Sequence, residues 1–208
     1  VIEAHDKFFV LHRLKFIIQM LSETKMRLGK HELLLTDEII AASRTPHLNS
    51  DPLIALYRES VLTITDEENE SHFFELKRLL EKHSEQVTIP ELRAFYTIAV
   101  NYCIRMMIKG KAAFEGERMQ LLKSQVEHRL IFAQGVIPPS KFKNIVSAGA
   151  KSREFEWTKT FIENESQYLS PKFQESVTAF SYAALAYYQK DYKNVGPHLM
   201  QMEYVDLY

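Results

Sequence analysis

The chain has 208 residues, of which 46% are hydrophobic and 25% are charged, and its formal net charge is −1. A chain of this length can bury a substantial core, so one domain over residues 1–208, or one part of a longer repeat array, is expected. Dedicated nucleic-acid binders are usually basic, and membrane-surface proteins usually carry a dense basic face. Neither property is found in this composition, which therefore favours a protein or peptide partner.

Cysteine usage and the first residues indicate the compartment. The single cysteine, Cys103, excludes an intrachain disulfide and fits a reducing environment. The N-terminal residues Val1–Asp6 show neither the basic lead nor the small-residue cleavage site of a signal peptide. No apolar run reaches the roughly 18 residues that a membrane-spanning helix needs. The sequence therefore predicts a cytoplasmic protein with no membrane partner.

Apolar residues recur at helical spacing along the whole chain, without a long alternating pattern of the kind that strands show. The 6 glycines and 7 prolines stand mostly between these periodic segments, as in a helical protein. Helices are expected at about residues 5–28, 31–43 and 52–64, from 66 to before 90, at 90–110, 111–134, 141–148 and 151–168, from 171 to 190, and from about 194.

Several boundaries carry specific signals. Residues 45–52 are interpreted as a loop, in which Asp51 caps the next helix and Pro52 occupies its first turn. The acidic run 66–70 is interpreted as the solvated first turn of another helix, where carboxylates interact favourably with the helix dipole. Pro197 fits the first turn of the last helix but not its middle.

A shared apolar phase indicates an internal repeat. Two helices carry a large, a medium, a small and a tyrosine residue at i, i+3, i+4 and i+7: Phe95, Ile98, Ala99 and Tyr102, and Phe180, Ala183, Ala184 and Tyr187. A third helix matches in part: Phe142, Ile145, Val146 and Gly149. Looser matches begin at Leu11 and Leu53, so the period is about 42 residues, or one antiparallel helix pair. Because one pair cannot bury both of its faces, neighbouring pairs are expected to stack.

This pattern resembles the first helix of the tetratricopeptide repeat, and Ala186–Tyr192 resembles the end of that helix and its turn. More loosely, the segment from Asn101 to Tyr192 resembles uncharacterised bacterial proteins built from divergent repeats of this type. The period is longer than the family's 34 residues, so the class is tetratricopeptide-like. The resemblance implies an all-α, right-handed solenoid of about five helix pairs whose concave face binds peptides or partner proteins.

A search for chemistry finds no catalytic pattern. The eight histidines form no metal-binding HExxH pair, and His5 and His12, which could share a helix face, lack further ligands. Cys103 stands within an apolar helix, away from the helix N-terminus that would activate a thiol. Neither a phosphate-binding glycine loop nor a GxSxG nucleophile motif is present. We therefore predict a non-enzymatic protein with no metal, no cofactor and no catalytic residue.

Three residues are candidates for contact with a partner. Asn101 and Tyr188 stand just beside the packing stripes of their helices, and Arg105 follows Asn101 by one turn. The alternative function is that of a helical-repeat nucleic-acid-binding protein, suggested by a group of basic residues: Lys141, Lys143, Lys151, Arg153 and Lys159. Glutamates stand among them, so solvated helix faces are the simpler interpretation, and a nucleic-acid partner is disfavoured.

The last residues, 198–208, are amphipathic and rich in large apolar side chains. Because a repeat array normally ends in a unit with a polar outer face, two hypotheses follow. Either the natural chain continues beyond Tyr208, or the C-terminal helix forms a homodimer or partner surface. Complete burial of four side chains within one protomer would contradict both: Leu199, Met202, Val205 and Leu207.

Overall fold

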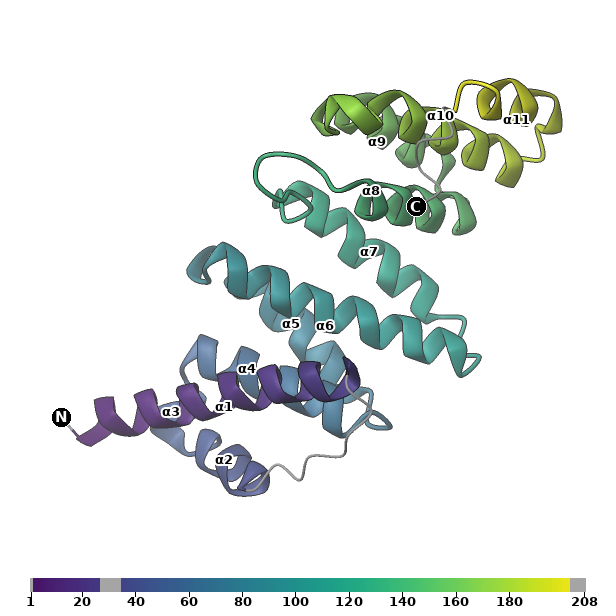
Figure 1. Ribbon diagram of the computed structural model, residues 1–208. Helices are drawn as coiled ribbons and strands as arrows, with labels where there is room; N and C mark the ends of the chain where they lie inside the picture. Colours follow the sequence, from purple (N-terminus) through teal and green to yellow (C-terminus); the bar gives the residue numbers. More distant parts are fainter. Residues whose placement is uncertain (1, 27–34, 203–208) are drawn as a thin grey trace. The chain divides into compact units, whose positions relative to one another are not determined.

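The computed structural model describes residues 2–26 and 35–202, and its regular elements there are helices apart from one isolated bridge between Ala133 and Val136 (Figure 1). The all-α prediction is thus confirmed for the described residues. The chain divides into two compact units, residues 1–114 and 115–208. The helices of the first unit are α1 (Ile2–Met26), α2 (Thr36–Ser43), α3 (Pro46–Asn49), α4 (Pro52–Thr65), α5 (Ser71–His83) and α6 (Ile89–Ile108). Those that follow are α7 (Phe114–Glu127), α8 (Pro139–Lys151), α9 (Phe155–Glu165), α10 (Pro171–Tyr188) and α11 (Tyr192–Leu199).

In the first unit, α4 is the central helix and packs against α1, α5 and α6 (Figure 1). Contacts between aromatic rings connect α4, α5 and α6. Phe73 of α5 stacks on Tyr102 of α6 with ring centroids 5.0 Å apart, and Tyr57 of α4 meets Phe95 of α6 edge-on at 4.7 Å. Such offset and edge-to-face pairs stabilise a core beyond the burial of their surface.

The start of α4 is fixed by the predicted cap. The Asp51 carboxylate accepts hydrogen bonds from the backbone amides of Leu53 at 2.9 Å and Ile54 at 3.1 Å, and Pro52 occupies the first turn. Burial raises the pKa of Asp51, but the ion pair with Lys7 of α1 and the two amide bonds outweigh it and lower that pKa. The cap therefore also fastens α1 to α4.

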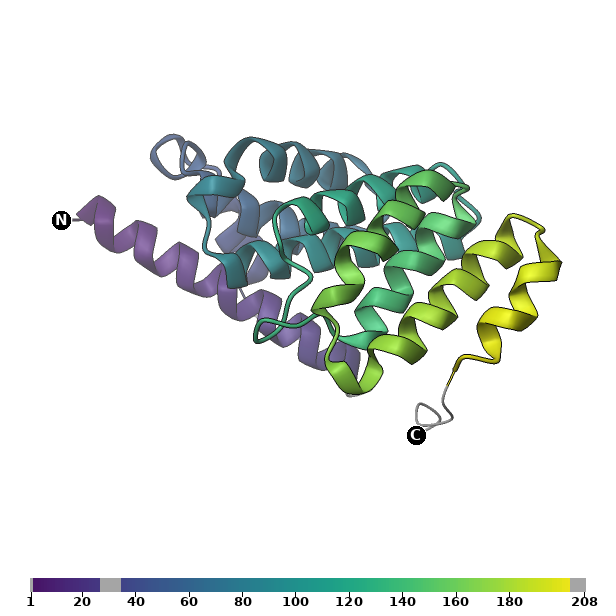
Figure 2. The same ribbon diagram turned by 90° about the horizontal axis from the view of Figure 1, so that it is seen from above.

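In the second unit, α10 packs against α8, α9 and α11, and Figure 2 shows α11, in yellow, beside α10. Phe142 of α8 contacts Phe161 of α9 with ring centroids 4.8 Å apart. Gly149 of α8 lies directly against Thr158 of α9, where even a Cβ atom would overlap the threonine side chain. The absence of a side chain at Gly149 is thus what allows the two helices to approach here, although the repeat pattern has its small residue one turn earlier, at Val146.

Two helix starts differ from the prediction. The expected loop 45–52 contains the short helix α3, and the acidic run 66–70 precedes α5 instead of opening it. The run forms a turn whose carboxylates pair with Arg105 of α6 and with Lys109 and Lys111, which follow α6. Of the helix expected at 31–43, only Thr36–Ser43 is observed, and residues 31–34 lie outside the described part of the chain.

The helix predicted at 111–134 is shorter and ends at Glu127. Arg129 adopts a left-handed backbone with φ of 57°, and its guanidinium lies over the rings of Phe132 at 4.0 Å and Tyr168 at 4.6 Å. Leu130 and Ile131 are buried in the turn that follows. These contacts stabilise the turn in place of further helix, although local propensity would allow the helix to continue. Pro197 also differs from its predicted position, because it lies inside α11.

The repeat phase describes packing in α6 and α8 but fails at the end of α10. Phe95, Ala99 and Tyr102 are fully buried, whereas Tyr187, which occupies the equivalent position in α10, is 56% exposed. The ring of Tyr187 contacts Tyr192 of α11, at the junction where the chain passes from α10 to α11. The period of about 42 residues, the solenoid and the single domain over residues 1–208 stay predictions.

The C-terminal hypothesis is tested only in part. Leu199 is 47% exposed and Met202 is half-buried, so complete burial is not observed for these two. Val205 and Leu207 lie outside the described residues. Among residues 2–26 and 35–202, the helices are all too short or too polar to cross a membrane.

Candidate functional site

Two of the predicted contact residues lie on α6 in the first unit. Asn101 is exposed, whereas Arg105 is half-buried and is held by the protein itself. The Nε of Arg105 donates to Oε2 of Glu67 at 3.0 Å, and its guanidinium lies 5.7 Å from the centre of the Tyr102 ring. Arg105 therefore fastens α6 to the turn before α5. For Asn101, exposure is the one observation that agrees with a role in partner contact.

The acidic run 66–70 belongs to the same arrangement. Glu67 and Glu68 pair with Lys109 at 2.8 and 2.6 Å, and Glu70 pairs with Lys111 at 2.6 Å. The hydrogen bond from Lys109, followed by the charges of Arg105 and Lys109, lowers the pKa of Glu67 against the opposing effect of burial. This group of ion pairs is a structural clasp between α6 and the turn.

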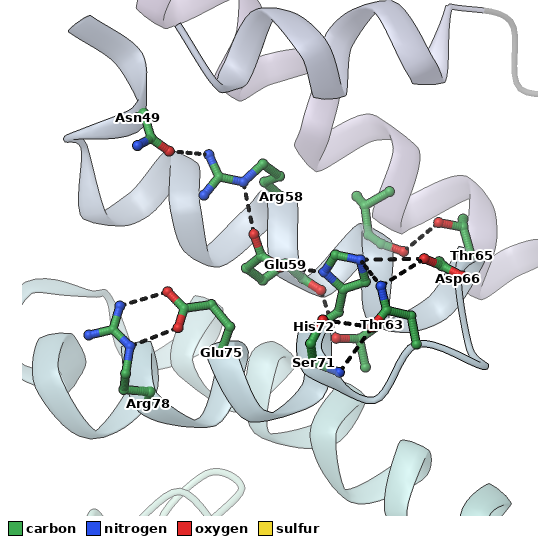
Figure 3. A network of polar contacts seen from close by, with 12 residues as sticks. Asn49, Arg58, Glu59, Thr63, Thr65, Asp66, Ser71, His72, Glu75 and Arg78 are labelled. Atoms are coloured by element: carbon green, nitrogen blue, oxygen red, sulfur yellow. Dashed lines mark hydrogen bonds and ion pairs between the residues drawn. The ribbon is translucent and has the colours of Figure 1, made fainter. Parts of the chain in front are cut away.

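A second polar network joins α4 to α5 (Figure 3). Glu59 is buried, and its Oε1 accepts from Nε of Arg58 at 2.9 Å while its Oε2 lies 2.8 Å from Nδ1 of His72. Arg58 is also buried and donates to Asn49 and to the Ser43 carbonyl. A carboxylate beside an imidazole resembles an acid–base pair. However, the burial of Glu59 and Arg58 closes the pair to a substrate and indicates a structural role.

The third predicted contact residue, Tyr188, lies in an exposed group of aromatic rings at the junction of α10 and α11. Tyr187, Tyr188 and Tyr192 are 56%, 38% and 63% exposed. Tyr187 contacts Tyr188 edge-on with ring centroids 5.5 Å apart and contacts Tyr192 at 6.0 Å. We call these three residues the tyrosine cluster. Large exposed aromatic groups are unusual on the surface of a monomer and mark interaction sites.

An open groove is lined by residues of α9, α10 and α11. It consists of two hollows with volumes of about 590 Å³ and 250 Å³, and both are lined by Tyr182 and His198. The Tyr182 and His198 rings stack with centroids 5.5 Å apart and form a wall common to both hollows. Gln189 and Asp191, which line the smaller hollow, stand in sequence between Tyr188 and Tyr192. We call the two hollows the α10–α11 groove.

The charge of the groove is acidic. Glu175 lines the larger hollow, and Glu156 and Asp191 line the smaller one. Lys159, which also lines the smaller hollow, contributes a positive charge. The formal charge of the two linings is therefore −2 when His198 is neutral. Burial, followed by the charge of Glu163, raises the pKa of Tyr182. The phenol O–H is a hydrogen-bond donor at this site.

The basic residues that suggested nucleic acid are dispersed among other contacts. Lys141 donates to Gln125, Lys143 lies 5.5 Å from the centre of the Phe180 ring, and Lys159 pairs with Glu163 at 3.9 Å. Such contacts are those of ordinary helix surfaces.

In the described part of the chain, no three His, Cys, Asp or Glu side chains are grouped so that they could hold a metal ion. Cys103 is fully buried in α6, as its apolar surroundings in the sequence predict. That the protein has no catalytic activity, metal or cofactor stays a prediction, because these two observations test none of the three.

Comparisons with protein-family models, with curated proteins and with solved structures found no match to this chain. The structure defines an all-α protein with two compact helical units, and its likeness to tetratricopeptide repeats stays an expectation from the sequence.

The sequence analysis missed the groove. Tyr182 and His198 are 16 residues apart, and His198 was considered only as a metal ligand. Only the packing of α11 on α10 brings the two rings together. The one usable signal was the density of tyrosines late in the chain, which led to Tyr188 but not to the hollows along α10.

Proposed function

We propose that this protein is a non-catalytic helical-repeat scaffold that binds a protein or peptide through the α10–α11 groove and the tyrosine cluster. The proposal rests on a group of three exposed tyrosine rings at the junction of α10 and α11, two helices that also line a groove with hollows of about 590 and 250 Å³. Tyrosine combines a large apolar surface with a polar tip and is enriched among the residues that dominate binding energy. The proposed scaffold is a right-handed, tetratricopeptide-like stack in the cytoplasm.

The chemistry of the groove favours an extended peptide that carries a basic side chain. The stacked aromatic rings of Tyr182 and His198 line both hollows, with Glu175 in the lining of the larger one and Asp191 in that of the smaller one. A guanidinium or ammonium group is attracted both by an aromatic face and by carboxylates. The formal charge of −2 would repel a phosphate backbone, which weighs against the nucleic-acid alternative.

The test is selection from a random-peptide display library on the purified chain, followed by fluorescence anisotropy with a synthetic copy of the selected peptide. We expect selected peptides to carry Lys or Arg and to lose affinity at least about tenfold when Tyr187 and Tyr192 are both replaced by serine. The matched control is Ile108→Ser in the first unit, which removes an apolar side chain that is 80% exposed and distant in sequence from the groove.

Equal binding of the selected peptides by the wild type and the double tyrosine variant would overturn the proposal. The same holds if the library yields no binder while a single-stranded oligonucleotide binds with an affinity that falls steeply with salt. That second outcome would favour the nucleic-acid function instead.

A further inference from the structure

Helix α1 presents apolar side chains on two of its faces. Val10, Leu14 and Ile17 form a buried stripe, which is the side on which α1 packs in the first unit. A second row lies on a different side of the helix and is exposed along its whole length: Ile2, His5, Phe9, His12 and Phe16. We call this row the α1 seam.

The spacing of the α1 seam is that of a coiled coil. Its members follow one another at alternating intervals of three and four residues, which is the heptad pattern of a helix that pairs with another helix. Ile2, Phe9 and Phe16 occupy one heptad position and are 77%, 50% and 42% exposed. His5 and His12 occupy the other position. All five side chains are exposed, so packing within the first unit does not account for their heptad spacing.

Ion pairs hold α1 in place with the seam outward. Lys7 pairs with Asp51 at the start of α4, and Lys15 pairs with Glu91 of α6 at 2.7 Å. The ammonium group of Lys15 also lies 5.3 Å from the centre of the Tyr57 ring. The seam is therefore presented on a helix that is fixed to its unit, and it needs no rearrangement before it can pair.

We propose that the α1 seam pairs with the same seam of a second copy of this chain, antiparallel and about a two-fold axis. In this register Phe9 lies opposite His12 of the second copy, and His5 lies opposite Phe16. Every imidazole then meets a phenyl ring. Phe8 and His12 already stack in this way within α1, with ring centroids 5.9 Å apart and planes inclined by 13°.

Charge complementarity selects the second copy and the antiparallel direction. Asp6 and Arg13 flank the seam on the same side, seven residues apart. The antiparallel register brings Asp6 opposite Arg13 of the second copy, and the two-fold axis repeats this pair. A parallel pairing would instead place His12 against the same histidine and bring no opposite charges together across the seam. Of these two orientations, the antiparallel one is thus the one in which the surface is complementary to itself.

This inference is independent of the proposed peptide site, which lies in the second unit. A dimer would carry two α10–α11 grooves, so a partner with two copies of the recognised peptide would bind with increased avidity.

The experiment is sedimentation equilibrium of the full chain over a wide concentration range, with wild type, Asp6→Arg and Arg13→Asp. We expect the wild type to form dimers and each variant alone to dimerise at least about tenfold more weakly, because like charges then face each other. An equimolar mixture of the two variants restores dimers, since each Asp–Asp or Arg–Arg contact becomes an Asp–Arg pair. Only antiparallel pairing through this register gives that rescue.

Phe9→Ser keeps the proposal testable if Arg13→Asp does not fold, which circular dichroism will show. This variant is expected to dimerise at least about tenfold more weakly than wild type, whereas Ile108→Ser, with an 80% exposed side chain outside the seam, dimerises normally. A wild type that stays monomeric at all concentrations overturns the proposal. So does a dimer that survives Asp6→Arg and Phe9→Ser, and loss of that dimer in Leu199→Ser would assign the interface to the C-terminal helix.

Discussion

Gly149 of α8 lies so close to Thr158 of α9 that a Cβ atom on the glycine would overlap Oγ1 of the threonine. Met119 of α7 approaches the same point, with its Cε 3.5 Å from the position that a Cβ would occupy. We expect Gly149→Ala to lower the free energy of unfolding by about 1–3 kcal/mol, because the helices must separate to make room. The shift of the urea unfolding midpoint measures this loss.

Gly116 provides the control for that substitution. It stands in α7 with nothing within 4 Å of its Cβ position. We expect Gly116→Ala to stabilise the protein by about 0.5–1 kcal/mol, since alanine has the higher helix propensity. Both substitutions gain helix propensity, so the opposite sign at Gly149 comes from its packing against Thr158. Equal effects would contradict the close approach of α8 and α9.

The buried network of Figure 3 predicts a large effect from a small chemical change. Glu59→Gln preserves the shape of the side chain but removes the charge that Arg58 and His72 face at 2.9 and 2.8 Å. Because Arg58 is buried, we expect a loss of about 3 kcal/mol in the free energy of unfolding, measured by urea titration.

The exposed pair of Glu75 and Arg78, also drawn in Figure 3, is the matched comparison. Their side chains are 39% and 57% exposed, and a pair in water contributes little to stability. Glu75→Gln should therefore leave the unfolding midpoint where it is. A shift as large as that of Glu59→Gln would show that burial is not what distinguishes the two pairs.

The acidic turn predicts a dependence of stability on pH. The hydrogen bond from Lys109 lowers the pKa of Glu67 in the folded protein relative to its ordinary value of 4.5. A lowered pKa means that the carboxylate stabilises the fold above about pH 4.5 and that this contribution is lost as the pH falls through the folded-state pKa. Glu67→Gln should therefore be less stable than wild type by at most about 1 kcal/mol at neutral pH.

Unfolding of the two proteins at a series of pH values tests this expectation. The difference between wild type and Glu67→Gln should shrink as the solution becomes more acidic. Glu68→Gln serves as control, because Glu68 also pairs with Lys109 but its side chain is 79% exposed. A difference that grows on acidification would contradict the predicted sign.

The residues predicted as partner contacts should separate into two kinds. Arg105→Met is expected to lower stability by about 1 kcal/mol and to leave peptide affinity unchanged, because Arg105 is occupied by Glu67 and Tyr102. Tyr188→Ser is expected to leave stability unchanged and to weaken peptide binding. Thermal unfolding and anisotropy of the selected peptide, measured on both variants, distinguish the two roles. If Arg105→Met weakened peptide binding and Tyr188→Ser lowered stability, Arg105 would be the contact residue and Tyr188 the structural one.

The helices were predictable because their signals are local. Apolar spacing, the cap at Asp51 and the position of Pro52 act within a few residues, and the structure confirms them. The burial of Phe95, Ala99 and Tyr102 followed from the same spacing. The heptad spacing of the α1 seam is also present in the sequence. However, helical spacing alone does not determine which of two apolar faces a helix will bury.

Tertiary packing decided the rest. The acidic run 66–70 forms a turn that pairs with Arg105 of α6 and with the lysines that follow α6. Residues 128–134 leave the helix, and there the Arg129 guanidinium packs on the rings of Phe132 and Tyr168. The α10–α11 groove exists because α11 packs on α10 and brings His198 to Tyr182. Local propensities differ by only a few tenths of a kcal/mol per residue, so contacts between distant segments override them. A sequence therefore determines where its helices form more directly than which of their faces meet.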